Sequence, residues 1–155
     1  MQWITRERPK IDRIACPWLI RRFIDAESEF IFCPADEVMN RAAVTGAIPF
    51  DVEGAELAHD GPLCSFDALL KKYNLTDPAL LQIATIVRGA DTARLDLAPE
   101  AAGLLAISLG LSRHFADDHV QLEHGMVMYD ALYAWARFAR DETHTWNPKT
   151  AGSRR

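Results

Sequence analysis

The sequence has no apolar run long enough to cross a membrane, and it lacks the cysteine pattern of a small secreted domain. A membrane helix needs about 18 or more consecutive apolar residues, and no stretch here reaches that length. The three cysteines, Cys16, Cys33 and Cys64, form no CxxC motif, and an odd number of this kind favours reduced thiols. The opening MQWITRERPKID has no apolar core typical of a secretion signal. We therefore expect a cytoplasmic protein with no membrane partner.

An excess of positive charge is also absent, and so are the short motifs that identify common enzymes. The formal net charge is −5, whereas nucleic-acid platforms are usually basic, so we do not expect this chain to bind nucleic acid. The motifs HExxH, GxxxxGK[ST], GxGxxG and GxSxG do not occur. Catalytic residues therefore cannot be assigned from a single motif.

What is present is the composition of one globular domain. The chain has 155 residues, 49% hydrophobic and 25% charged, which is ordinary for a single folded unit. We assign residues 1–145 to one domain. The polar end WNPKTAGSRR shows no periodic pattern, so residues 146–155 are predicted to form a flexible tail.

The two halves of the chain have different textures. The first half alternates short β-like runs with helical segments, and the second half reads as helix throughout. Strands are predicted at 3–5, 30–33 and 48–52. Helices are predicted at 35–44, 65–73, 77–89, 98–111 and 117–140. Because a strand-helix-strand opening favours a parallel or mixed sheet, we predict an α/β fold whose small N-terminal sheet is covered by a largely helical C-terminal half.

Two of these helices carry predictions about burial. The segment 98–111 is apolar nearly all round, a pattern that indicates a helix inside the core. The segment 117–140 is predicted to pack inward through one face. That face consists of Val120, Met128, Leu132, Trp135 and Phe138.

The segment PKIDRIACPWLIRRF places polar side chains where a core helix should begin. Pro17 cannot donate a backbone hydrogen bond, so it is expected in the first helical turn. The helix would then begin near Cys16, with 12–15 as the preceding turn. In that turn Asp12 supports the local structure and faces a ligand, with a metal as its candidate partner. Cys16 is either a packing residue or a thiol activated by nearby cations.

The loop DVEGAELAHDGPLCSFD concentrates side chains that can bind a metal. Asp51 follows a predicted strand, and His59 lies farther along the loop. Carboxylate and imidazole groups together suit Mn, Fe or Zn. The alternative is a solvated polar loop, although His59 follows the apolar pair Leu57 and Ala58 and is therefore expected to point inward.

Two more candidates follow in the helical half. Asp91, in VRGADT, is either a cap or a metal ligand. His124, in EHGMVMYD, lies on the predicted core face and is either a hydrogen-bonded core residue or a ligand. Its neighbour Gly125 costs about 1 kcal/mol against alanine inside a helix, which a close backbone approach or a bound group would explain.

Arginines near these acids could hold an anion. Arg13 precedes the predicted helix, Arg88 ends another, and the run TRERPK adds three cations. The planar guanidinium group suits tetrahedral oxyanions. The alternative is ordinary surface charge, and for Arg88 a favourable position at a helix C-terminus.

Several long strings together resemble a known family. PKIDRIACPWLIRRFID, IPFDVEGAELAHDGPLCSFDALLKKY, IVRGADT, LDLAPEAAGLLAISLGLS and LEHGMVMYDALYAW are similar to the bacterial chromate-resistance family, and more narrowly to its ChrB C-terminal domains. The resemblance implies a role in the response to chromate stress, either directly or in a chromate-responsive regulator. Longer members carry an N-terminal region expected to bind DNA, which this chain does not show.

A weaker similarity concerns the order of the acidic groups. Asp12, Asp51, His59 and Asp91 follow one another as in DHH-type metallophosphoesterases, but paired histidines are missing here, which favours one metal over two. The leading hypothesis is a domain that binds one divalent metal near a small oxyanion, chromate or a phosphate ester. Alternatives are a metal-dependent hydrolase, a sensor without turnover, and thiol-based reduction through Cys16 and Cys64. A homodimer remains open.

Overall fold

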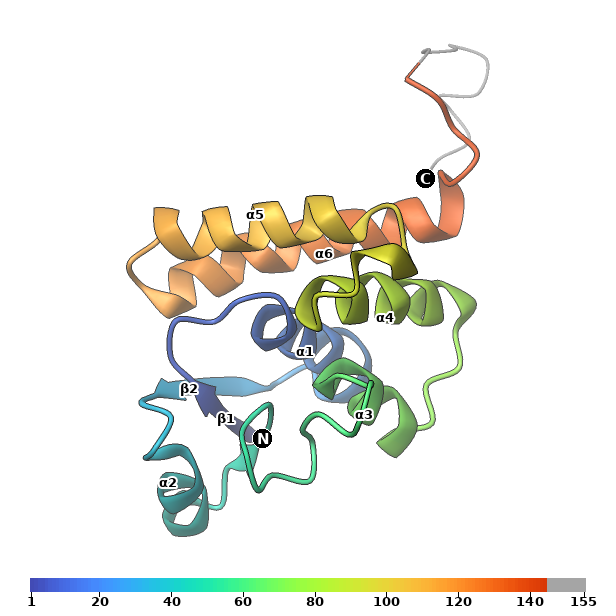
Figure 1. Ribbon diagram of the computed structural model, residues 1–155. Helices are drawn as coiled ribbons and strands as arrows, with labels where there is room; N and C mark the ends of the chain where they lie inside the picture. The colour runs from blue at the N-terminus through green and yellow to red at the C-terminus, as the bar shows by residue number, and fades with distance from the viewer. Residues whose placement is uncertain (145–155) are drawn as a thin grey trace.

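The chain folds as a small parallel sheet with helices around it, the predicted α/β class (Figure 1). This computed structural model describes residues 1–144, so the predicted tail at 146–155 lies outside the described residues. The strands are β1 (Gln2–Arg6), β2 (Glu29–Cys33) and β3 (Ile48–Pro49). The helices are α1 (Asp12–Leu19), α2 (Val38–Thr45), α3 (Ser65–Lys72), α4 (Pro78–Asp91), α5 (Ala101–His114) and α6 (Asp118–Phe138), with a π-helical turn η1 (Ile20–Ile24) and a 3₁₀ turn η2 (Leu95–Leu97).

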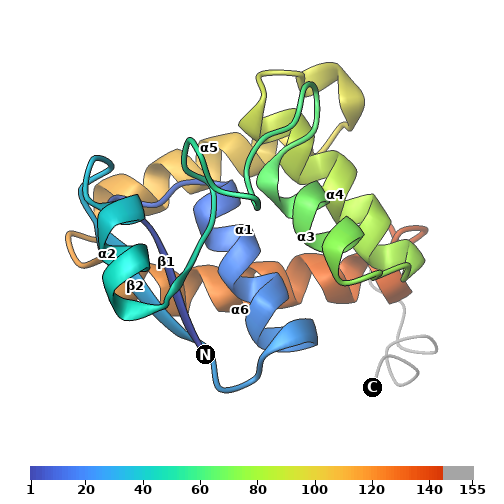
Figure 2. The same ribbon diagram turned by 90° about the horizontal axis from the view of Figure 1, so that it is seen from below.

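The strand order is β2-β1-β3, and every pair is parallel. Successive side chains of β1 point to opposite faces, so Trp3 joins the larger core with α1, while Ile4 joins a smaller core with Val38 and Ala42 of α2. The helices α1 and α2 therefore cover opposite faces of the sheet (Figure 2). The chain moves from β1 to one neighbour through α1 and then across to the other through α2. In parallel sheets, a cleft for ligands opens at the carboxyl ends of the strands at such a reversal.

Side-chain caps begin the later helices where the sequence predicted. The Asp77 carboxylate accepts the Ala79 N–H at 2.8 Å, and Pro78 is the first helical residue of α4. Asp117 accepts the His119 N–H at 2.8 Å at the start of α6. Such caps satisfy amide groups that have no partner inside the helix.

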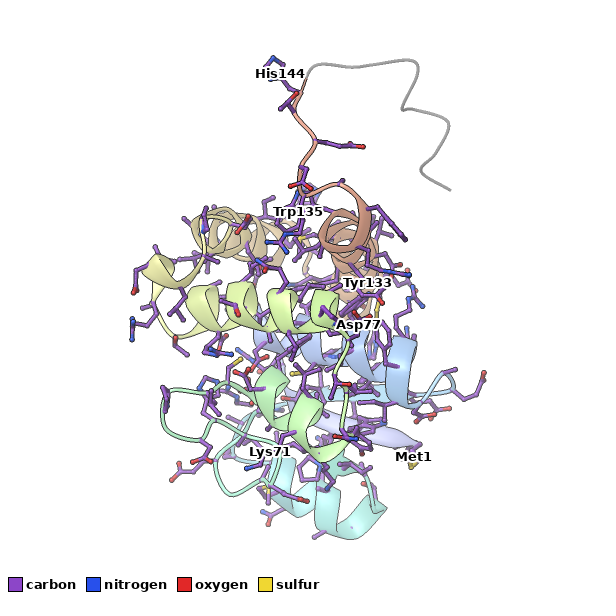
Figure 3. All side chains as sticks on the ribbon, turned by 90° about the vertical axis from the view of Figure 1, so that its right-hand side faces the viewer. Met1, Lys71, Asp77, Tyr133, Trp135 and His144 are labelled. Atoms are coloured by element: carbon purple, nitrogen blue, oxygen red, sulfur yellow. The ribbon has the colours of Figure 1, made fainter. Side chains whose placement is uncertain are left out.

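Helices α3, α4 and α6 all pack against α1, and α5 packs chiefly against α4 (Figure 1). The Tyr133 hydroxyl of α6 donates a hydrogen bond to the Asp77 carboxylate at the start of α4 (Figure 3). No helix in residues 1–144 is long and apolar enough to cross a bilayer.

Helix α1 corrects one expectation, because it begins at Asp12 and not near Cys16. Pro17 lies inside the helix, where it removes a backbone hydrogen bond at a cost of about 3 kcal/mol. The helix persists because its apolar residues are deeply buried, with Trp18 and Leu19 at 0% exposure. Before it, Ile11 adopts a φ of 43°, which is strained for a β-branched residue.

The burial predicted for α5 was wrong, and the inward face predicted for α6 was right only in part. On α5, Ile107 is 56% exposed, and the buried face includes Ser108 and Ser112. On α6, Met128, Leu132 and Trp135 pack against the core as predicted, whereas Val120 and Phe138 are exposed. An apolar pattern along a helix does not predict how many of its sides are covered by neighbouring elements. Part of the apolar surface of α5 and α6 faces solvent.

Gly125 is explained by a close approach of two helices. A Cβ atom at Gly125 would lie 2.3 Å from Cγ2 of Ile14 on α1. The glycine therefore lets α6 lie directly against the helix that carries Asp12 and Arg13.

Candidate functional site

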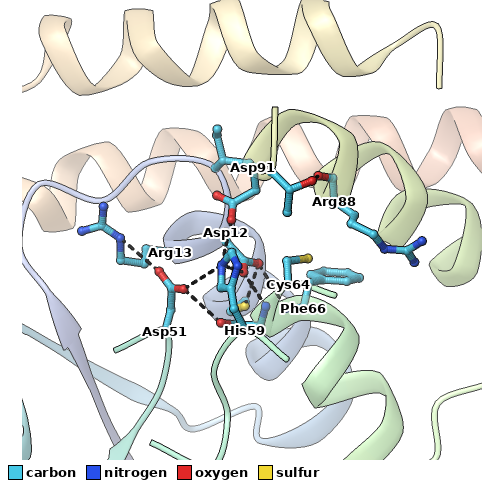
Figure 4. A network of polar contacts seen from close by, with 12 residues as sticks. Asp12, Arg13, Asp51, His59, Cys64, Phe66, Arg88 and Asp91 are labelled. Atoms are coloured by element: carbon cyan, nitrogen blue, oxygen red, sulfur yellow. Dashed lines mark hydrogen bonds and ion pairs between the residues drawn. The ribbon is translucent and has the colours of Figure 1, made fainter. Parts of the chain in front are cut away.

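The carboxyl ends of the strands and three loops bring the predicted polar residues together (Figure 4). Arg6 ends β1, and Asp51 follows β3 with a φ of 48°. Asp12 is the first residue of α1, and Asp91 is the last residue of α4. His59 reaches the same point from the long loop between β3 and α3.

The imidazole of His59 lies at the centre of this group. Its Nε2 atom is 3.0 Å from Oδ2 of Asp91, 3.3 Å from Oδ1 of Asp51 and 3.8 Å from Oδ2 of Asp12. One potential ligand atom each from Asp12, His59 and Asp91 lie within 4.8 Å of one another. Because the His59 side chain is 41% exposed, the group is reachable from solvent.

Asp12 is fully buried and is held by the start of another helix. Its carboxylate accepts the backbone N–H groups of Ser65 at 2.7 Å and Phe66 at 3.1 Å, and the Cys16 thiol at 3.1 Å. Burial, followed by the negative charges of Asp91 and Asp51, raises the pKa of Asp12 well above its ordinary value. Within residues 1–144 no lysine or arginine contacts this carboxylate.

Asp51 connects the acidic group to two arginines. Its Oδ1 accepts the Ser65 hydroxyl at 3.0 Å, and its Oδ2 lies 2.9 Å from Nη2 of Arg6 and 3.3 Å from Nε of Arg13. Arg6 also donates from Nε to the Asp51 carbonyl oxygen at 2.9 Å. The positive charges therefore lie on one side of Asp51, and His59 lies on the other.

Burial changes the acid-base properties of the neighbouring groups. Burial, together with the charge of Asp51, raises the pKa of Asp91. Burial, followed by the charge of Arg6, lowers the pKa of Arg13. Arg13 also donates from Nη1 to the carbonyl oxygens of Arg6 at 3.3 Å and Glu7 at 2.9 Å, which fixes its orientation.

A cavity of about 520 Å³ opens beside the group. Its walls include Arg6, Asp51, Glu53, Gly54 and His59. A ligand in this cavity would reach both the imidazole of His59 and the guanidinium group of Arg6.

Two of the predicted site residues lie elsewhere. His124 is exposed on α6 and stacks on Phe115 with ring centroids 4.4 Å apart, so its expected inward position was wrong. The helical stripe that faces α1 is one residue away, at Gly125. Arg88 donates through Nε and Nη2 to Asp67 at 2.9 and 2.7 Å, so both of these donors are occupied.

The cysteines near the site are buried thiols. Burial, followed by the negative charge of Asp12, raises the pKa of both Cys16 and Cys64. The Cys16 thiol donates to Asp12, and the Cys64 thiol donates to Asp67. Such an environment opposes formation of the reactive thiolate.

Sequence reasoning missed Arg6 and Ser65 as neighbours of the acidic group. Arg6 belongs to the cationic run TRERPK, and its position at the end of a predicted strand was the available signal. Ser65 had no signal, because its contacts with Asp12 and Asp51 join residues 53 and 14 positions apart.

The comparisons with known proteins agree with the sequence motifs. Residues 3–136 match the family described as ChrB, C-terminal domain. Protein ChrB of Cupriavidus metallidurans is 33% identical over 139 residues, which cover 85% of this chain and 40% of that protein. The chain thus spans less than half the length of this relative, and no solved structure matches it. The chain belongs to the ChrB C-terminal domain family, the chromate-resistance family that its motifs resemble.

Proposed function

We propose that this chromate-resistance domain binds one divalent metal ion through Asp12, His59 and Asp91, and a small oxyanion beside it. The observation that carries the proposal is the convergence of these three donors within 4.8 Å around a carboxylate that is fully buried. Asp51 lies close enough to His59, at 3.3 Å, to serve as a further ligand after a small rotation.

The charge around Asp12 supports a cation at this position. Three aspartates crowd the site, and each added negative charge disfavours the ionised form of its neighbours. A divalent ion relieves this repulsion and neutralises Asp12, which no lysine or arginine of residues 1–144 contacts. Oxygen and imidazole ligands are compatible with Mn, Fe or Zn, and the donor set does not select among them.

The oxyanion is placed in the cavity next to the arginines. Arg6 lines that cavity, and Arg13 lies beside Arg6 at the same oxygen of Asp51, with its Nε atom 3.3 Å from Oδ2. Guanidinium groups form charge-assisted hydrogen bonds with tetrahedral oxyanions, so chromate or a phosphate ester is the expected class. Arg88 has no part in this proposal, since Asp67 holds its side chain.

Metal-dependent hydrolysis is the second candidate. Asp12, Asp51, His59 and Asp91 lie close together in the fold. Their order along the chain is the one that is similar to DHH-type metallophosphoesterases. A bound metal would supply an activated water molecule at such a site. The thiol route is weaker, because Cys16 and Cys64 are buried and their raised pKa values oppose ionisation. These two cysteines and Cys33 are free thiols, which fits the proposed cytoplasmic location.

Metal binding can be measured by elemental analysis and by calorimetric titration of the metal-free protein with Mn²⁺ and Zn²⁺. We expect one ion per chain. Replacement of His59 by alanine or Asp91 by asparagine should weaken binding at least about 100-fold, since even residues behind metal ligands contribute 10- to 100-fold. His124→Ala is the matched control, because this exposed histidine lies outside the group and should leave the affinity unchanged.

The metal titration and two further assays separate the alternatives. A wild-type protein that binds no ion, or an equal loss in the His59 and His124 variants, would contradict the metal proposal. Hydrolysis of a phosphodiester with added Mn²⁺, lost in His59→Ala, would favour the enzyme. Chromate binding without turnover, weakened by Arg13→Gln, would favour the sensor.

A further inference from the structure

The connection between β1 and α1 lies beside the turn between α5 and α6 (Figure 1). Residues of both segments line a second cleft. The backbone N–H of Arg8 donates to Oδ2 of Asp118 at 3.0 Å, and Gln121 donates from Nε2 to the carbonyl oxygen of Pro9 at 2.7 Å. These bonds hold the two segments together. The cleft has a volume of about 330 Å³ and is lined by Arg8, Ser112, Arg113, Phe115, Ala116 and Asp118.

One wall of this cleft carries a buried hydroxyl group without a partner. Ser112 is 7% exposed, and its Oγ atom forms no hydrogen bond with any described residue. A buried polar group left unsatisfied costs about 1–3 kcal/mol. Nearly all such groups in folded proteins are satisfied. The Oγ atom is closed to the cleft as it stands, and rotation of the Ser112 side chain toward the cleft would give this hydroxyl an acceptor in a bound anion.

The cleft also contains two guanidinium groups without a carboxylate. Among residues 1–144, the side chains of Arg8 and Arg113 form no hydrogen bond or ion pair. Six other arginines in the described part of the chain form ion pairs with carboxylates. Those that hold an aspartate or glutamate are Arg6, Arg13, Arg22, Arg41, Arg88 and Arg94.

The single acid in the cleft does not cancel this charge. Asp118 already accepts the N–H of Arg8 through Oδ2, and the two arginines leave the cleft with one net positive charge. Phe115 forms the apolar wall of the cleft. Its ring stacks on His124 with an interplanar angle of 11°, which fixes its position.

We propose that this cleft binds a phosphoryl or sulfuryl group, with Arg8 and Arg113 as charged donors and the Ser112 hydroxyl as a third donor. Arg8 comes from the connection between β1 and α1, and Ser112 and Arg113 come from α5. Guanidinium groups form strong charge-assisted hydrogen bonds with phosphate oxygens. The volume exceeds that of a free oxyanion, so the group is either free or carried by a small organic molecule that contacts Phe115. None of the cleft residues belongs to the proposed metal group, so the inference does not rest on the proposed function.

The test uses the full chain, stripped of metal by a chelator, and inorganic phosphate as the probe. Amide chemical shifts are followed by NMR during a phosphate titration, with phenyl phosphate as a parallel titration. We expect saturable shifts at residues 112–118 and at Arg8. Tighter binding of phenyl phosphate would identify an organic phosphate as the occupant, and equal binding would identify the free ion.

Variants assign the effect to the cleft. Arg113→Gln and Arg8→Gln should each weaken phosphate binding about tenfold or more, the loss expected for a hydrogen bond to a charged group. Arg94→Gln is the control, because it removes one exposed arginine that lies just before η2 and outside the cleft. Ser112→Ala should weaken binding while the phosphate-free protein unfolds at the same or a higher temperature, since the change removes an unsatisfied hydroxyl.

Several results would overturn the proposal. One is the absence of saturation, and another is an equal loss in Arg94→Gln, which would indicate general charge attraction. Shifts that cluster at Arg6, Arg13 and His59 and vanish in Arg13→Gln would place the anion at the first site instead.

Discussion

Asp130 shows how one carboxylate joins α1 and the turn after it to α6. It accepts the Trp18 indole N–H at 2.9 Å and two donors of Arg22, at 2.9 Å from Nε and 2.8 Å from Nη2. The hydrogen bonds from Arg22, more than the one from Trp18, hold the pKa of Asp130 below its ordinary value. The ionised form is therefore the one that stabilises the fold.

We expect Asp130→Asn to lower the free energy of unfolding by about 1 kcal/mol at pH 7, a modest value because the pair is partly screened by solvent. The folded pKa lies below the unfolded one, so the contribution is complete above the unfolded value of about 4 and disappears as the pH falls through the folded pKa. Urea unfolding of both proteins between pH 2 and 7 measures this. A difference that persists at the lowest pH would contradict it, and Asp96→Asn, in an exposed pair with Arg94, is the control.

At the scale of elements, the packing of α6 on α1 depends on one glycine. The space at Gly125 is occupied by the Ile14 side chain, whereas a Cβ atom at Gly110 on α5 would meet nothing within 4 Å. Both glycines lie inside helices. The two positions therefore separate helix propensity from helix-helix contact.

Alanine at these positions should have opposite effects. Gly110→Ala should raise the free energy of unfolding by about 0.5–1 kcal/mol, because alanine favours the helix. Gly125→Ala should lower it by about 1–3 kcal/mol, because the added methyl group overpacks the interface. Denaturant midpoints with unchanged slopes provide the measurement. Stabilisation by both substitutions would mean that the helices separate at no cost.

At the scale of the whole molecule, Trp18 connects several layers of the fold. It is 0% exposed, stacks on Phe66 of α3 with centroids 6.5 Å apart, and meets Tyr129 and Tyr133 of α6 at 5.9 and 5.7 Å. A substitution at Trp18 therefore affects the packing of α1, α3 and α6 together.

Trp18→Ala should lower the free energy of unfolding by about 3–5 kcal/mol, the usual cost of removing a large buried aromatic side chain. The free energy of unfolding of a folded domain is only about 5–15 kcal/mol, so the variant should be close to unfolded at 37 °C. Far-UV and near-UV circular dichroism should report one shared transition. Phe138→Ala, at 61% exposure, should leave the midpoint nearly unchanged. Two separate transitions in Trp18→Ala would contradict cooperative unfolding of the two cores as one unit.

The sequence alone determined the local features of this protein. The starts of α4 and α6, the stop of α2 at Gly46 and the three strands were predictable because caps, prolines and glycines act within about four residues of themselves. The long motifs also placed the chain in its family. Asp51, His59 and Asp91 were predictable as candidates because strand ends and loops concentrate functional side chains.

Tertiary structure alone decided which of these residues meet. In the folded chain Asp12 is buried against the first turn of α3, and Arg6 pairs with Asp51. Arg88 pairs with Asp67, and His124 lies on the surface. The tertiary structure also kept α1 helical through Pro17 and exposed the outer side of α5. These outcomes depend on neighbours that are remote along the chain, and a one-residue rotation of a helix turns a side chain by about 100°, enough to move it from the core to solvent.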